Sequence, residues 1–96
     1  MLKKDLVDKV ASATGLPKKT VAEVVDTMLD SIVEAAANGE TVLLTGFGKW
    51  TGGIREPKPI KLKGYEGMTK RAPYVKFSLG KVFKEAVKNA PLSKFE

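Results

Sequence analysis

Basic side chains that could bind phosphate groups are concentrated between residues 49 and 76. This span holds eight lysines and arginines against two glutamates, so it carries the whole net charge of +6. The eight are Lys49, Arg55, Lys58, Lys61, Lys63, Lys70, Arg71 and Lys76. Charge segregated in this way is typical of an element that binds a polyanion, and is less expected of a surface that only needs to be soluble.

Catalytic chemistry has few candidates in this chain. The sequence has no histidine and no cysteine, which removes the usual general base, the commonest metal ligand and every thiol nucleophile. The carboxylates are scattered along expected helices, and no Gly-x-x-x-x-Gly-Lys-[Ser/Thr] loop occurs. We therefore expect a protein that is not an enzyme, with no catalytic residue, no metal site and no cofactor.

The sequence offers no membrane segment. No apolar run approaches the ~20 residues needed to cross a bilayer, and residues 1–5 are amphipathic rather than typical of a signal peptide. We expect a cytoplasmic protein with no membrane partner.

The length of the chain bears on its assembly. Ninety-six residues make one small domain. If the basic span extends as an arm, the rest is short enough to bury only about 60% of its unfolded surface. Without disulfides or metals, the simplest stabilisation is a second subunit. We expect an obligate dimer, of two identical chains or of this chain with a paralogue.

Apolar periodicity places two helices at the start of the chain. A stripe from Leu2 to Ala13 predicts a helix over residues 3–14, ended by Gly15. A second helix is expected over residues 18–37, ended by Asn38-Gly39. Its apolar stripe is wide enough to predict burial against the first helix and against a second subunit.

The middle of the chain is predicted to form strands. Residues 40–45 are β-branched and apolar, Gly46-Phe47-Gly48 predicts a tight turn, and Trp50 begins a second strand. A returning strand over residues 70–77 alternates with period two. Pro57 and Pro59 lie between them and suit an edge strand.

The tip of this expected ribbon follows from its pairing. Residues 64–67, Gly-Tyr-Glu-Gly, are its turn-rich centre. If Trp50 lies opposite Phe77, the midpoint falls near Lys63-Gly64.

Ser78 is the expected N-cap of a last helix over residues 79–90, ended by Pro91 and followed by a frayed tail. Trp50 and the phenylalanines Phe47, Phe77 and Phe83 are interpreted as core.

Over nearly the full length of the chain, these elements resemble the bacterial histone-like DNA-bending proteins of the HU/IHF family. The strongest local matches are Leu43-Leu44-Thr45-Gly46-Phe47-Gly48 and the segment from Phe77 to Val87, Phe-Ser-Leu-Gly-Lys-Val-Phe-Lys-Glu-Ala-Val. The resemblance implies an α+β fold: an intertwined dimer with a helical body, a small antiparallel sheet and two extended β-ribbon arms. Residues 1–48 would form the helical hairpin and first strand, residues 49–77 the arm, and residues 78–96 the C-terminal helix and tail of a single domain.

The resemblance also implies a function. Such proteins are nucleoid-associated and bind double-stranded DNA through the minor groove with little sequence specificity, bending or compacting it. Lys81 and Lys84 match positions where the family places phosphate-contacting lysines. Lys3, like Lys18 and Lys19, is either a phosphate contact or a solvated helix end. The residues we expect to bind DNA are Lys3, Arg55, Lys58, Pro59, Lys61, Lys63, Lys70, Arg71, Lys76, Lys81 and Lys84.

The arm departs from the family at its tip. The usual Arg-Asn-Pro-x-Thr-Gly string, whose proline wedges between base pairs, is absent, and the arm is about two residues shorter. Three residues compete as the intercalating wedge. Pro59 follows a basic residue and its rigid ring loses no side-chain entropy on insertion, whereas Ile60 and Leu62 lie closer to the midpoint. We favour Pro59.

Two other functions fit the charge pattern. The arm of a small dimeric interaction module could clasp an acidic protein, or the chain could bind RNA. Bending of short duplex DNA separates these functions, because neither a protein that clasps an acidic partner nor a nonspecific polyanion binder would bring the ends of a duplex together.

Overall fold

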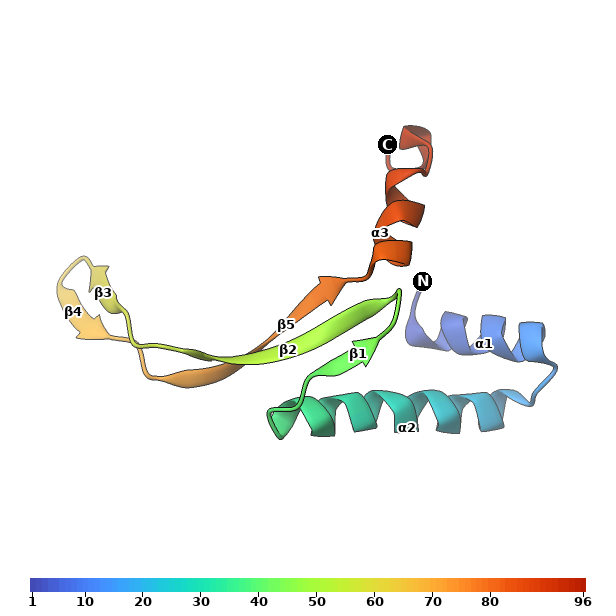
Figure 1. Ribbon diagram of the computed structural model, residues 1–96, viewed down its shortest axis with the longest axis horizontal. Helices are drawn as coiled ribbons and strands as arrows, with labels where there is room; N and C mark the ends of the chain where they lie inside the picture. Colours follow the sequence, from blue (N-terminus) through green and yellow to red (C-terminus); the bar gives the residue numbers. More distant parts are fainter. The chain divides into compact units, whose positions relative to one another are not determined.

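A computed structural model describes the backbone of residues 1–96 and every side chain except those of Leu62 and Tyr65. The chain contains three α-helices, five strands and a short 3₁₀ helix (Figure 1). It forms two compact units, residues 1–34 and residues 35–96, which we describe separately. The elements are α1 (Lys3–Thr14), α2 (Lys18–Ala37), β1 (Val42–Leu44), β2 (Gly48–Arg55), β3 (Pro59–Leu62), β4 (Tyr65–Met68), β5 (Ala72–Leu79), α3 (Lys81–Lys88) and η1 (Leu92–Lys94).

The first unit is a helical hairpin with the boundaries that the sequence predicts. Gly15 ends α1 in the left-handed conformation, at φ 74°, and its N–H donates to the Ala11 carbonyl. The buried core of the unit consists of Val7, Ala11 and Val21. This core is small because much of the wide apolar stripe of α2 stays open to solvent, as Val24 at 61% exposure illustrates. A single chain therefore leaves uncovered the second face that the sequence predicts to be buried.

The second unit is built on an antiparallel sheet in the order β1-β2-β5. β1 is shorter than predicted, since only Val42–Leu44 pair with β2. β2 and β5 pair over eight residues, with Trp50 opposite Phe77 as predicted. The α+β class with an antiparallel sheet and a β-ribbon is thus confirmed.

A second hairpin, β3–β4, follows the β2–β5 ribbon (Figure 1). Its two-residue turn is Lys63-Gly64, with Gly64 at φ 82°, so the midpoint prediction is correct. The prediction that residues 64–67 form the turn is wrong beyond Gly64, because residues 65–68 pair back on β3. Only Gly64 has the positive φ that this turn uses, and the residues after it, 65–68, are paired with β3.

The two hairpins share one register. Arg55 pairs with Ala72 and Pro59 with Met68, so three residues separate the ladders on each strand. The interruption contains Pro57, which has no N–H to donate. One backbone hydrogen bond crosses it, from the Thr69 N–H to the Lys58 carbonyl at 2.9 Å. The Thr69 hydroxyl accepts from the Lys58 N–H at 2.8 Å. This clasp of Lys58 and Thr69 keeps the strands aligned across the gap.

The start of α3 differs from the prediction. Ser78 is not its N-cap, since Ser78 pairs with Lys49 in the sheet and the cap is Gly80. The Gly80 N–H donates to the Phe47 carbonyl at 2.8 Å. A Cβ on Gly80 would lie 2.4 Å from the carbonyl carbon of Gly46, so only glycine allows this approach. The sheet therefore runs two residues further than expected, and the helix is shorter, at Lys81–Lys88.

The expected frayed tail is also partly ordered. Leu92–Lys94 form a 3₁₀ turn after Pro91, in which the Lys94 N–H donates to the Pro91 carbonyl.

The aromatic residues expected in the core form a half-open cluster. The ring centroids of Trp50 and Phe77 are 4.7 Å apart, and those of Phe47 and Phe83 are 5.2 Å apart. Phe47 nevertheless remains 47% exposed. The cluster is thus a core that one chain only partly covers. Within the described chain, no helix is both long and apolar enough to cross a membrane.

Candidate nucleic-acid interface

The β2–β5 ribbon has two chemically different faces. Directly paired residues of an antiparallel ladder project to the same side, and successive residues alternate. One face is apolar and carries Trp50, Ile54, Pro73, Val75 and Phe77. The other is basic and carries Lys49, Thr51, Gly53 and Arg55 from β2 with Ala72, Tyr74, Lys76 and Ser78 from β5. We call this second side the basic face.

Three cations of the basic face are exposed: Lys49, Arg55 and Lys76. The guanidinium carbon of Arg55 lies 5.8 Å from the centroid of the Tyr74 ring, within the range of a cation–π contact. Of these three residues, Arg55 and Lys76 were predicted to bind DNA. Exposed cations aligned on one side of a ribbon can neutralise successive phosphates of a nucleic-acid backbone.

The interrupted part of the arm holds Lys58, Lys70 and Arg71, all exposed. Arg71 Nε lies 3.5 Å from Glu56 Oε1, and both side chains are more than 60% exposed. Such an exposed ion pair contributes at most about 1 kcal/mol. A phosphate can therefore replace Glu56 as the partner of Arg71 at little cost.

The tip hairpin carries two further predicted cations. Lys61 pairs directly with Glu66 across the ladder, and Lys63 lies in the turn. Both side chains are exposed. The two acidic residues of the arm, Glu56 and Glu66, thus each lie opposite one basic residue.

The three candidates for the intercalating wedge differ in their exposure and position. Pro59 is exposed at the start of β3, and Ile60 is half-buried opposite Gly67. The side chain of Leu62 lies outside the described residues. Met68 pairs directly with Pro59 and is 60% exposed, which places a second apolar side chain beside the proline. Sequence reasoning missed Met68, although the midpoint at residues 63–64 already implies the pairing of residues 59 and 68.

The predicted cations outside the arm have separate environments. Lys3 Nζ donates to Asp26 Oδ1 at 2.7 Å, and this hydrogen bond raises the pKa of Lys3 above its ordinary value. Lys3 is therefore charged at neutral pH and already has an anionic partner. Lys81 and Lys84 are exposed in the first turn of α3, three residues apart and hence on one side of the helix.

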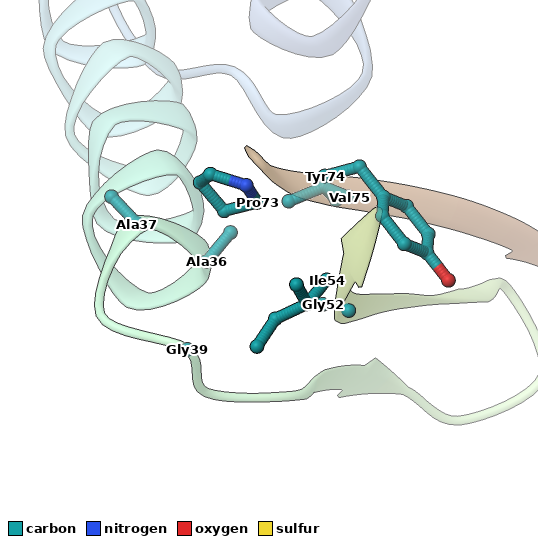
Figure 2. A pocket seen from close by; sticks show the side chains of 9 residues that line it. Ala36, Ala37, Gly39, Gly52, Ile54, Pro73, Tyr74 and Val75 are labelled. Carbon is teal, nitrogen blue, oxygen red and sulfur yellow. The ribbon is translucent and has the colours of Figure 1, made fainter. Parts of the chain in front are cut away.

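The apolar face borders a cavity of about 600 Å³ at the end of α2. Figure 2 shows Ile54 and Pro73 on the side of Ala36, with the Tyr74 hydroxyl extending away from the helix. The lining is made mostly of small and apolar side chains: Ala36, Ala37, Gly39, Gly52, Gly53, Ile54, Pro73, Tyr74 and Val75. It offers no polar constellation for a small-molecule reaction. Among the described side chains, no three acidic groups gather in a way that could hold a metal ion.

Comparison with known proteins identifies the family. The family model described as bacterial DNA-binding protein matches residues 1–88. The chain is 43% identical over 88 residues to DNA-binding protein HU of Thermus thermophilus, covering 90% of this chain and 91% of that protein. It is 39% identical over 94 residues to DNA-binding protein HU of Thermotoga maritima, covering 92% and 100%.

Comparison with solved structures gives the same family. The chain superposes on Anabaena HU, from an HU–DNA cocrystal structure, with a TM-score of 0.85 and 30% identity, covering 94% of this chain and 100% of that one. HU from Thermotoga maritima gives a TM-score of 0.65 at 36% identity, covering 91% and 98%. The resemblance found in the sequence is thereby confirmed: the chain belongs to the bacterial DNA-binding protein family that includes HU.

Proposed function

We propose that this protein is an architectural DNA-binding protein that binds duplex DNA with little sequence specificity and bends it. The observation that carries the proposal is the location of the whole net charge of +6 in the arm, residues 49–76, where the β2–β5 ribbon has one basic face. The similarity to an HU chain solved with DNA supports duplex DNA as the partner, over RNA or an acidic protein. We place the protein in the cytoplasm, at the nucleoid, with no enzymatic role.

The proposed mechanism divides the basic residues by location. Arm cations neutralise phosphates on both sides of the minor groove, and the bend brings flanking DNA toward cations outside the arm. Base-reading amides are absent from the arm, since the only asparagines are Asn38 and Asn89 and there is no glutamine. The proposed phosphate contacts are Lys3, Arg55, Lys58, Lys61, Lys63, Lys70, Arg71, Lys76, Lys81 and Lys84.

The experiment that tests this function is duplex bending. Short DNA labelled with a fluorophore at each end should show increased energy transfer when the protein binds. The logarithm of the affinity should fall linearly with the logarithm of the salt concentration. For each tenfold increase in salt, the fall should be about 0.9 log unit per phosphate neutralised. Binding to an acidic protein or to RNA without bending of duplex DNA would reject the proposal in favour of an alternative.

We further propose that the working unit is a dimer. Three features support this: the open stripe of α2, the half-open aromatic cluster and the apolar cavity beside Ile54 and Pro73. Sedimentation at micromolar concentration should give about twice the 10.4 kDa chain mass. The midpoint of urea unfolding should rise with protein concentration, because association stabilises the folded state by mass action. A folded monomer at micromolar concentration would contradict the dimer.

Pro59 is the proposed wedge, and its replacement tests the bending step. Pro59→Ala removes no charge, so affinity for straight duplex should change little while the bend angle falls. Preference for already kinked or gapped DNA should rise, because unstacking a base step costs a few kcal/mol that such DNA has already spent. Met68→Ala, Ile60→Ala and Leu62→Ala are the comparison variants. Normal bending by Pro59→Ala with loss in one of the others would assign the wedge to that residue instead.

A further inference from the structure

The basic face contains an arrangement around Gly53 that the phosphate contacts alone do not explain. Gly53 pairs directly with Tyr74, and the tyrosine ring lies over the glycine. A Cβ on Gly53 would lie 2.6 Å from both Cζ and the hydroxyl oxygen of Tyr74. The ring therefore occupies the space that any larger residue at position 53 would need. Glycine weakens a strand, and covering it with a cross-strand aromatic ring restores packing at that position.

The ring that covers Gly53 also contacts Arg55. Arg55 is two residues beyond Gly53 on the same face, so it is a diagonal neighbour of Tyr74, within reach of an aromatic and a long side chain. Its guanidinium carbon is 5.8 Å from the ring centroid. The other arginine of the chain, Arg71, is instead paired with the carboxylate of Glu56. Arg55 is thus held by a neutral surface that leaves its charge and its N–H donors available.

We infer that Tyr74 is a positioning residue whose ring, packed over Gly53, holds Arg55 for contact with a DNA phosphate. This inference rests on the proposed DNA-binding function. A long side chain loses rotamer entropy when it binds a phosphate, and prior packing against a ring reduces that loss. Guanidinium stacking on a ring leaves the edge of the guanidinium free to donate two parallel hydrogen bonds to phosphate oxygens.

Replacements at position 74 separate the ring from its hydroxyl. Tyr74→Leu should weaken binding to a straight labelled duplex about 2- to 5-fold, the size of an exposed cation–π contact. Tyr74→Phe should retain binding, because it keeps the ring. Equal weakening by Phe and Leu would show that the hydroxyl acts directly, and would overturn the inference.

A double-mutant cycle tests whether Tyr74 acts through Arg55. Arg55→Ala should lower the salt slope by about 0.9. In the Arg55→Ala background, Tyr74→Leu should cause no further loss. The matched control uses Lys76, an exposed cation on the same face, and the effects of Lys76→Ala and Tyr74→Leu should be additive. A full Tyr74→Leu effect without Arg55 would refute positioning.

Gly53→Ala displaces the ring without deleting it. The added methyl group would push the Tyr74 ring away, so this variant should weaken binding as Tyr74→Leu does. The control is Gly53→Ala in the Tyr74→Leu background, where no ring is left to displace, so the added methyl group should cause no further loss. Normal binding by Gly53→Ala with a displaced ring would count against the inference.

A measurement without DNA tests the contact between Tyr74 and Arg55 separately from the DNA-binding function. The Nε–H resonance of Arg55 should be shifted by the ring current in the wild type and in Tyr74→Phe, and not in Tyr74→Leu. With only two arginines in the chain, the assignment is direct. Absence of duplex binding by the wild type would reject the DNA-binding function and the inference with it. Normal wild-type binding with no ring-current shift and no coupling would reject the inference alone.

Discussion

Gly80→Ala should lower the free energy of unfolding by about 3 kcal/mol, the upper part of the usual range for an overpacked site. The reason is that the new methyl group would meet backbone, with its Cβ 2.4 Å from the carbonyl carbon and 2.6 Å from the carbonyl oxygen of Gly46. Neither atom can rotate away. Relief requires α3 to move off the β1–β2 turn, which breaks the hydrogen bonds from Gly80 to Phe47 and from Phe83 to Gly46.

The measurement is urea unfolding at one fixed protein concentration, since dimerisation makes the midpoint concentration-dependent. Ser93→Ala serves as the control. Ser93 is exposed in η1 of the same unit, so this substitution should change stability by less than about 1 kcal/mol. Equal midpoints for Gly80→Ala and the wild type would show that the close approach of Gly80 to Gly46 does not contribute to stability.

The second large effect concerns the tip of the arm. Lys61→Ala combined with Lys63→Ala should weaken duplex binding at 0.1 M salt by up to about 60-fold and reduce the salt slope by up to about two. Both lysines are exposed at the end of the ribbon, where a phosphate can reach them. Because the contacts are to phosphate, the loss should be similar for all DNA sequences.

The control for this variant is Lys4→Ala combined with Lys9→Ala. These two exposed lysines of α1 carry the same charge but lie outside the proposed contacts. Titration by fluorescence anisotropy at several salt concentrations should give a slope close to that of the wild type. Equal losses in the two double variants would mean that net charge, rather than the arm, controls affinity.

The sequence predicts the elements whose signals are local. Helical periodicity and Gly15 give α1 and α2 with their observed boundaries. The pairing of Trp50 with Phe77 places the hairpin turn at Lys63-Gly64. Alternation is a property of the strand itself, so one correct pair determines the whole ladder.

The features that the sequence does not reveal depend on contacts between distant residues. Ser78 has the chemistry of an N-cap, but its pairing with Lys49 extends the sheet and moves the cap to Gly80. The role of Tyr74 depends on the absence of a side chain at Gly53 across the ladder. The exposure of Phe47 depends on what one chain alone cannot cover. A single-residue propensity contains none of this information.

The common register of the two hairpins has a consequence for how the arm can change length in evolution. Three residues on each side separate Arg55–Ala72 from Pro59–Met68, so inward and outward positions stay in step from the base to the turn. Inserting one residue in one strand would send every side chain beyond it to the opposite side. A matched change of one residue in each strand keeps the pairing but still turns every rung beyond it to the opposite side. Insertions and deletions that keep both the pairing and the orientation should therefore come as two residues in each strand.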